Sequence, residues 1–346
     1  MNFDRAVLFS LLMLCLASVC LPQQKLPPAH IEAIYFYGHG DRDVAKLKES
    51  LPISVGDKFD SPIPLIETRP KVEEAVRKVT GLPVTDVSYV SPGGEKWLVY
   101  IGVAGPSVKT FTYNVVPTGN VRLPVEAMRI YREANQAFIN AMMAGHAGED
   151  DSRGFALSSD DPELREKQLA MNDYAVKNEA IIRNVLRSSS DEEHRQAAAQ
   201  LLGYANSSRQ QINELVRASR DGDETVRNNA TRALIVLARS DKKTAAMIPA
   251  GDFVEMLNSG EWTDRNKAGG LLGELTRPRP ARLLRTLRSQ AFESLAEIAR
   301  WETGHAQPAR EMLGRIAGIE ESRLEKLVAD DSRVDEIVAA AKRVTP

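Results

Sequence analysis

Cysteine is nearly absent from this sequence of 346 residues, which has only Cys15 and Cys20. Both lie in an apolar N-terminal stretch, so a chain that loses this stretch has no thiol, no disulfide and no cysteine-bound metal. Histidine is scarce as well, and no two histidines stand at the spacing of metal ligands. They are His30, His39, His146, His194 and His305. We therefore expect neither a metal nor another cofactor.

The sequence also lacks common catalytic motifs and a strong charge of either sign. It contains no Gly-x-Ser-x-Gly, no phosphate-binding glycine loop and no His-Glu-x-x-His. The formal net charge is -2, which gives no general attraction to nucleic acid. Beyond the N-terminus, no apolar run approaches the roughly 20 residues that cross a bilayer. We expect no enzyme, no nucleic-acid partner and no membrane span in the mature chain.

The N-terminus has the pattern of a secretory signal peptide. An apolar run, residues 6–21, follows a short polar start and ends at Pro22. We assign residues 1–22 to this peptide and predict export to a periplasm, a cell envelope or the medium. Cys20 allows a lipid anchor, but Val19 stands where such anchors have Gly or Ala, so an ordinary signal-peptide cysteine is favoured. A membrane-tethered protein that keeps this helix is the alternative.

Residues 30–104 have the pattern of a small α/β domain. A strand that starts near Ile31 is followed by a helix capped by Asp43 and by a second helix with Pro70 in its first turn. Two more strands meet at the turn 91–94. The order β-α-α-β-β predicts a mixed sheet that is covered by two helices.

This segment resembles a polypeptide-transport-associated (POTRA) domain. The resemblance rests on the opening strand 31–38, on Val-Gly-Asp-Lys-Phe at 55–59 and on the closing strand 98–103. POTRA domains bind proteins in cell envelopes, in some cases by adding a strand at a sheet edge. The resemblance therefore implies a docking surface at the edge of this sheet. Some other small α/β fold is the alternative.

A connector punctuated by Pro and Gly, residues 105–124, leads into a long stretch of helix and turn patterns. We expect a helical linker region over 125–164, where Asp161 caps a long helix. The acidic run 149–152 lies in a loop of this region. Clustered carboxylates can bind a divalent cation, but Arg-Gly-Phe at 153–155 breaks the pattern of a calcium loop, so capping and solvation are favoured.

The strongest pattern is an internal repeat within residues 165–344. Four segments align without gaps, each with an alanine and a leucine four positions later. These columns hold Ala198, Ala230, Ala268 and Ala309, followed by Leu202, Leu234, Leu272 and Leu313; the first three copies begin with Arg195, Arg227 and Arg265, and the fourth has lost the arginine. Successive copies start 32, 38 and 41 residues apart, which is one helical hairpin per copy.

Each column has a physical role. Alanine lets neighbouring helices approach closely, and leucine one turn later fills the space between layers. Asp191, Asp223 and Asp264 stand at or before the starts of these helices, where a carboxylate caps free N–H groups. The pattern resembles the HEAT repeat, and 223–230 is its best copy. The resemblance implies a solenoid whose second helices line a concave surface for proteins; a plain helical bundle is the alternative.

One basic cluster lies inside the repeats. Arg279, Arg282, Arg285 and Arg288 recur every three positions, which predicts a slowly winding stripe on one side of a helix. The stripe can bind an acidic partner or lipid headgroups, although a solvated outer face is the simpler interpretation.

The fold class that we predict is α+β, with the POTRA-like domain followed by an all-α, HEAT-like solenoid. The function that fits it is an exported, non-enzymatic adaptor that binds another protein through the repeats and, as a second place, the sheet edge. A HEAT-like lyase is the enzyme alternative, but the sequence offers no acid, base and pocket for it.

Overall fold

The computed structural model describes residues 26–345 and divides them into two compact units. One consists of residues 26–109 and 260–262, and the other of residues 110–259 and 263–345. The predicted signal peptide, including Cys20, lies outside the described residues. Within residues 26–345, no helix combines the length and the apolar character that crossing a bilayer requires.

The smaller unit is built on a four-stranded mixed sheet with the strand order β2-β1-β4-β3. The strands are β1 (Ala29–Tyr37), β2 (Lys58–Phe59), β3 (Val84–Gly93) and β4 (Lys96–Val103). β1 runs parallel to β4, whereas β2 and β3 are antiparallel to their neighbours. The predicted hairpin between the last two strands is therefore present, and β3 forms one edge of the sheet.

Three helices belong to this sheet unit: α1 (Val44–Glu49), α2 (Pro62–Ile66) and α3 (Arg69–Thr80). The Asp43 carboxylate caps α1 by accepting the N–H of Ala45 at 2.9 Å, as predicted. α3 ends at Gly81, whose φ of +67° suits glycine. The expected small β region is confirmed. The sequence did not reveal β2 and α2, because two and five residues are too few for a periodic pattern.

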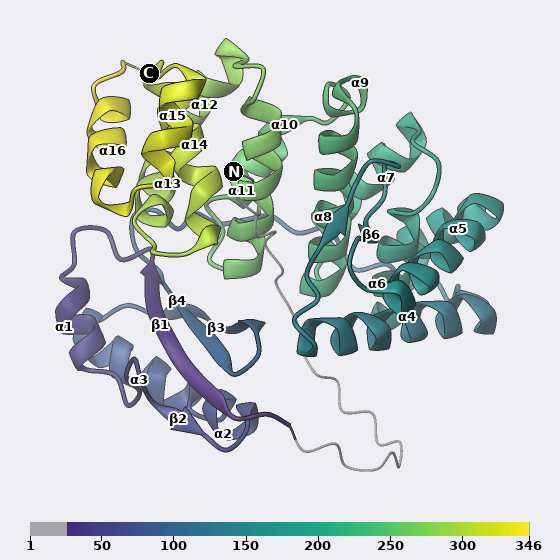
Figure 1. The fold of residues 1–346 in the computed structure, drawn as a ribbon, viewed down its shortest axis with the longest axis horizontal. Helices are drawn as coiled ribbons and strands as arrows, with labels where there is room; N and C mark the ends of the chain where they lie inside the picture. Colours follow the sequence, from purple (N-terminus) through teal and green to yellow (C-terminus); the bar gives the residue numbers. More distant parts are fainter. Residues whose placement is uncertain (1–25, 346) are drawn as a thin grey trace. The chain divides into compact units, whose positions relative to one another are not determined.

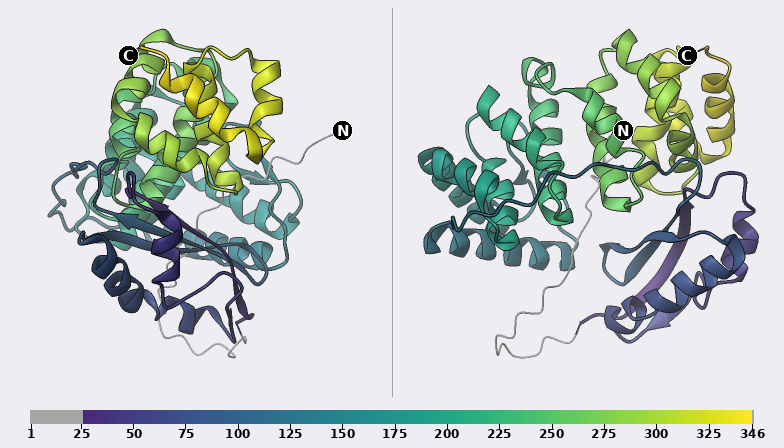
Figure 2. Two further views of the ribbon diagram at one scale, coloured as in Figure 1. Left: turned by 90° about the vertical axis from the view of Figure 1, so that its left-hand side faces the viewer. Right: turned by 180° about the vertical axis from the view of Figure 1, so that it is seen from behind.

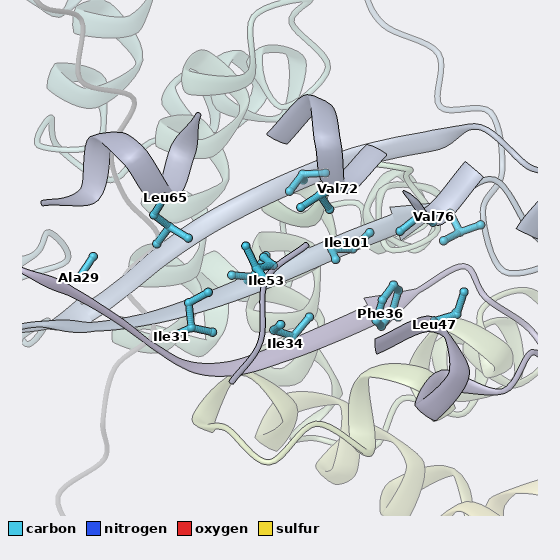
Figure 3. Close-up of a cluster of buried hydrophobic side chains, with 13 residues drawn as sticks. Ala29, Ile31, Ile34, Phe36, Leu47, Ile53, Leu65, Val72, Val76 and Ile101 are labelled. Atoms are coloured by element: carbon cyan, nitrogen blue, oxygen red, sulfur yellow. The ribbon is translucent and has the colours of Figure 1, made fainter. Parts of the chain in front are cut away.

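The core of the sheet unit lies between its helices and one face of the sheet (Figure 3). A bulge between Ile31 and Ala33 shifts the alternation of β1 by one residue. Ala29, Ile31, Ile34 and Phe36 are consequently all buried in this core. Leu47, Leu65, Val72 and Val76 of the helices belong to the same core.

Residues 260–262 complete the sheet unit, although they come from the second half of the chain. The rings of Tyr100 and Trp262 stack with their centroids 4.6 Å apart. The Tyr37 hydroxyl donates to the carbonyl of Gly260 at 3.0 Å, and the Trp262 N–H donates to Asp86 at 3.2 Å. The aromatic side chains of β1 and β4 are thereby covered by a short distant segment.

The larger unit is a stack of helices that follow one another along the chain (Figure 1). They are α4 (Val125–Met143), α5 (Pro162–Ser188), α6 (Glu192–Leu202), α7 (Arg209–Ala218), α8 (Glu224–Ser240), α9 (Lys242–Ala245), α10 (Ala250–Met256), α11 (Trp262–Thr276), α12 (Ala281–Gln290), α13 (Phe292–Ala299), α14 (Gln307–Ile316), α15 (Glu321–Val328) and α16 (Val334–Lys342), with short 3-10 helices at Gly304–Ala306 and Asp331–Arg333. A small hairpin of β5 (Glu149–Asp150) and β6 (Leu157–Ser158) connects α4 to α5.

These helices pair as hairpins that stack on one another. α6 packs on α8, and α14 packs on α16, while α7 pairs with α8 and α13 pairs with α14. α5 leaves helical geometry at Asn178 (φ −124°, ψ 19°), which separates its first half from the half that precedes α6. We call α6, α8, α11 and α14 the second helices, because each carries one aligned copy of the repeat.

The repeat columns lie in the core between these layers. The four aligned alanines and four aligned leucines, from Ala198 to Leu313, are at most 2% exposed. Glycines permit the closest approaches: a Cβ on Gly270 of α11 would lie 3.1 Å from Cδ1 of Ile235 in α8. The predicted solenoid-like repeat region is confirmed.

Asp191 and Asp223 cap their helices, as predicted. The Asp191 carboxylate accepts the N–H of His194 at 3.3 Å, and Asp223 accepts the N–H of Val226 at 2.9 Å. Asp264 is different, because it is the third residue of α11 and completely buried. It stands in the first turn of α11, where a carboxylate was expected, and it accepts from Arg227 at 2.8 Å and from the Ser259 hydroxyl at 2.9 Å.

The predicted helical linker region is a layer of the stack. α4 packs on both α5 and α6. Its apolar stripe, which includes Ala127, Tyr131, Ala134 and Ala141, is buried. The first residues of the predicted connector, 105–109, belong to the sheet unit, and 110–124 belong to the helical unit.

The connector from residue 110 onward runs in extended form along the turns of the helical unit, as the blue trace in the right view of Figure 2. Its backbone pairs with these turns. Asn114 N–H donates to the Arg220 carbonyl at 2.7 Å, and Gly119 N–H donates to the Ser188 carbonyl at 2.9 Å. The Leu123 N–H ends the series by donating to His194 Nδ1 at 3.0 Å. The connector is therefore a fixed part of the helical unit.

Candidate interaction surface

The three aligned arginines of the repeats occupy equivalent places. Each guanidinium donates to the backbone carbonyl six residues earlier. Arg195 reaches Ser189 at 3.0 Å, Arg227 reaches Asp221 at 3.0 Å, and Arg265 reaches Ser259 at 2.6 Å. The arginine column thus holds the turn before each second helix, which satisfies carbonyls that would otherwise be buried without a donor.

The same guanidiniums also reach forward to the next repeat. Arg195 donates to both carboxylate oxygens of Asp221 at 3.0 Å, and Arg227 donates to Asp264 at 2.8 Å. Arg265 lies 3.6 Å from the Glu297 carboxylate. All of these side chains are at most 8% exposed, so the pairs lie where charge interactions are strong. We call Arg195, Arg227 and Arg265 with their acidic partners the arginine ladder.

The fourth repeat keeps this linkage through a displaced residue. Arg310 stands one helical turn after the column position that lost its arginine, and a helical turn keeps a side chain on the same face. It donates to the carbonyls of Ala299 and Trp301 at 2.7 and 2.8 Å and forms an ion pair with Asp331 at 2.6 Å. The buried side chains of the arginine ladder therefore stabilise the stack and are not accessible to a partner.

Two of the four arginines in the predicted stripe, Arg279 and Arg288, form contacts within the helical unit. Arg279 lies before α12, at a φ of +56°, and forms an ion pair with Glu321 at 2.7 Å. Arg288 donates to the carbonyls of Lys342 and Val344 at 2.8 and 3.0 Å, and its guanidinium covers the Phe292 ring. These contacts hold α15 and the end of α16 against the preceding repeat.

The stripe is therefore not a continuous face of one helix, which corrects the prediction. Helix α12 begins only at Ala281, because Pro278 and Pro280 keep the preceding residues out of it. Arg282 and Arg285 are the two stripe residues that are exposed on α12, and within residues 26–345 neither forms an ion pair. The exposure of Arg282 and Arg285 agrees with the simpler interpretation that this side of α12 faces solvent.

The acidic loop before α5 folds onto the helices instead of remaining solvated. Glu149 forms an ion pair with Arg232 at 2.5 Å, and Asp151 forms one with Arg239 at 2.6 Å. Both arginines belong to α8, two turns apart on one face. The Glu149 and Asp151 side chains are only 6% and 11% exposed. The predicted role of capping a nearby backbone N–H applies to Asp150, whose carboxylate accepts from the Ser152 N–H at 3.0 Å.

Apolar contacts hold the loop in the same place. Phe155 packs on Tyr204, with ring centroids 5.6 Å apart, and Leu157 is fully buried. The Ser158 N–H donates to Gln168 at 2.6 Å. We call residues 149–158 the acidic hairpin. In the described residues, no group of His, Cys, Asp or Glu side chains could hold a metal ion.

A lysine on the neighbouring second helix has no such partner. Lys267 of α11 is 3% exposed, yet within residues 26–345 its amine has no hydrogen bond or ion pair. Burial, with a smaller contribution from the positive charge of Arg232, lowers the pKa of Lys267 to about 7; Glu149 opposes this shift. We call Asn228, Arg232 and Arg239 of α8 together with Lys267 of α11 the second-helix face.

Sequence analysis did not identify Lys267 or the role of the acidic hairpin. Lys267 follows Arg265 by two positions inside a repeat copy, where a lysine ordinarily points to solvent. The one available signal was the alignment, because the other three copies have the uncharged residues Ala197, Asn229 and Pro308 at this position.

Comparison with known proteins supports the repeat. Residues 179–249 match a family model described as HEAT repeats, from the second half of α5 to just beyond α9. No curated protein matches the chain. Two engineered proteins in the solved structures have 16% and 18% identity and TM-scores of 0.37 and 0.36; the alignments cover 63% and 62% of this chain and 96% of each engineered chain.

A third solved structure is a designed armadillo repeat protein in complex with the peptide (KR)4. It has 13% identity and a TM-score of 0.35, and the alignment covers 62% of this chain and 98% of the designed chain. The resemblance of residues 30–104 to a POTRA domain stays a prediction.

Proposed function

Because residues 179–249 match HEAT repeats and the helices around them form the same stack, we propose that this protein is a non-enzymatic scaffold that binds another protein through the second-helix face. The observation that carries the proposal is the acidic hairpin. This face already holds an extended polypeptide segment, through Glu149 on Arg232 and Asp151 on Arg239. A surface that binds a segment of its own chain by side-chain contacts has the chemistry to bind an equivalent segment of a partner.

The arginine ladder supports the same function. Buried ion pairs link Arg195 to Asp221 and Arg227 to Asp264 across successive repeats. Charge pairs with fixed geometry favour one register between neighbouring repeats. A preorganised surface loses less conformational entropy on binding, which favours affinity.

The cellular location is the second part of the proposal. The apolar run 6–21 and Pro22 support export with removal of a signal peptide, which would place the scaffold in a periplasm, a cell envelope or the medium. Mass spectrometry of the N-terminus of the protein purified from its host tests this. A peptide that starts near residue 23 supports export, and an intact Met1 in the membrane fraction contradicts it.

Site-specific photo-crosslinking in the native host tests the binding surface. A photoreactive amino acid replaces either Asn228, on the second-helix face of α8, or Asn213, an exposed residue of α7 on a first helix. We expect a protein partner to crosslink at position 228 and not at position 213. Crosslinking to the same partner at 213 alone would move the binding surface to the other side of the stack.

A further inference from the structure

The second-helix face contains one buried charge for which residues 26–345 supply no hydrogen-bonded counterion. Lys267 is 3% exposed, and no hydrogen bond or ion pair within residues 26–345 reaches its amine. The carboxylate of Glu149 attracts the Lys267 amine through its charge, but this carboxylate already forms an ion pair with Arg232. A buried, unpaired ammonium group is costly, and the usual remedy is an opposite charge brought into hydrogen-bonding contact.

The acidic hairpin indicates the kind of segment that brings such a charge. Its carboxylates at 149 and 151 are two residues apart, so an extended chain presents them on one side, about 7 Å from one another. Their partners Arg232 and Arg239 are two helical turns apart, about 10 Å along the axis. The long arginine side chains close the difference, as the distances of 2.5 and 2.6 Å show.

We propose that Lys267 is the vacant carboxylate-binding position of this face, and that it takes an acidic residue of an extended partner segment that continues from α8 onto α11. The proposal rests on the scaffold function and specifies its partner class. The occupant is an extended acidic peptide, because the hairpin already holds Arg232 and Arg239 with carboxylates of an extended segment and Lys267 is the position left for one more.

Charged neighbours make such binding dependent on pH. Arg232 of α8 repels the protonated amine, and Glu149 of β5 attracts it. His305 lies close enough to interact with Lys267, but burial first, and Lys267 second, lower the pKa of His305, so it is neutral near pH 7. A carboxylate at Lys267 favours the ammonium form. Binding should therefore take up a proton and weaken as pH rises above the value near 7 that free Lys267 has.

The test uses the purified full chain and three synthetic peptides with alternating Thr and a second residue, which is Glu, Gln or Lys. Fluorescence anisotropy at low salt measures their affinities for the wild-type protein, for Lys267→Met, and for the control Arg282→Gln/Arg285→Gln. We expect only the Glu peptide to bind, Lys267→Met to lower its affinity by about tenfold or more, and the control to retain it. Equal binding of the Glu and Gln peptides, or unchanged binding to Lys267→Met, would overturn the proposal.

A second measurement needs no variant. Calorimetry of the wild-type protein with the Glu peptide, in two buffers with different ionisation enthalpies at a pH of about 8, should show uptake of close to one proton. Binding without proton uptake excludes Lys267 as the site. If photo-crosslinking at position 228 captures a partner but Lys267→Met leaves its yield unchanged, the scaffold function stands and this inference fails. Loss of crosslinking at both 228 and 213 would contradict the scaffold function itself.

Discussion

The Nε atom of Arg227 donates to Oδ1 of Asp264 over 2.8 Å, from one repeat to the next, and the two side chains are 1% and 0% exposed. Removing either partner leaves a buried charge without its opposite charge across this ion pair. We predict that Arg227→Met lowers the free energy of unfolding by about 3 to 5 kcal/mol, measured by urea denaturation. The matched control is Arg285→Met on the exposed side of α12, for which we expect a loss below about 1 kcal/mol.

A double substitution separates the ion pair from general packing. Because a buried pair often contributes little net stability compared with apolar residues of similar size, Arg227→Met/Asp264→Leu should recover part of the loss. A double variant as unstable as the sum of the single variants would show that the two residues act independently.

The leucine column offers a second stability test. Leu234 of α8 is fully buried, so Leu234→Ala leaves a cavity between layers and should cost about 2 to 5 kcal/mol of unfolding free energy. Ile181→Ala on α5, where the side chain is 44% exposed, should cost less than about 1 kcal/mol. Similar losses at both positions would mean that the burial of the column has been misassigned.

Two helical glycines should respond to alanine in opposite ways. A Cβ on Gly314 would lie 2.1 Å from Cδ1 and 3.1 Å from Cγ of Leu324, whereas the nearest atom to a Cβ on Gly269 is 3.9 Å away. We expect Gly314→Ala to destabilise the protein by about 1 to 3 kcal/mol through overpacking. Gly269→Ala should be neutral or stabilise it by up to about 1 kcal/mol, since alanine favours helix. Thermal unfolding tests this: the melting temperature should fall for Gly314→Ala and should stay the same or rise for Gly269→Ala.

Arg288 should control the order of the C-terminal helix. It donates to the carbonyls of Lys342 and Val344, which lie at the end of α16 and have no further helical partner. In Arg288→Gln, amide hydrogen exchange over 334–342 should accelerate several-fold, while exchange in α8 stays unchanged. Arg285→Gln, three residues earlier on the same helix, is the control and should leave α16 protected.

The buried amine of Lys267 predicts how stability depends on pH. Its pKa is lowered to about 7 in the folded protein, below the value of about 10.4 in an unfolded chain. Between these values only the unfolded chain holds the proton, so this group makes stability rise with pH across that window and penalises folding fully below about pH 7. Lys267→Met should therefore stabilise the protein at about pH 6, and the gain should vanish near pH 10. Urea denaturation at both pH values measures the difference.

The repeat was predictable because its signals are local and recurrent. An alanine with a leucine one turn later marks the buried side of each second helix, and the same pair occurs four times. The strands and longer helices of the sheet unit were predictable from Asp43, Gly81 and the alternation of apolar residues for the same reason. The place of Asp264 in the first turn of α11 was predictable in the same way, but its ion pair with Arg227 of the preceding repeat was not.

The contacts of the candidate site come from residues that are distant in sequence. Glu149 pairs with Arg232, and Arg279 pairs with Glu321; no local pattern identifies such partners. A charged residue near a turn has the same appearance whether it faces water or a guanidinium of another helix. For the same reason Lys267 was indistinguishable from a solvated lysine, since only tertiary packing buries it.

The extended connector changes how the stack should unfold. In a linear array, each repeat contacts only its neighbours, so the ends can fray independently. Here the connector bonds at Asn114 to the turn after α7 and at Gly119 to the turn after α5. Two repeats tied by one backbone segment gain or lose their structure together. Residues 110–240 should therefore behave as a single cooperative block, while local opening begins in the helices that follow it.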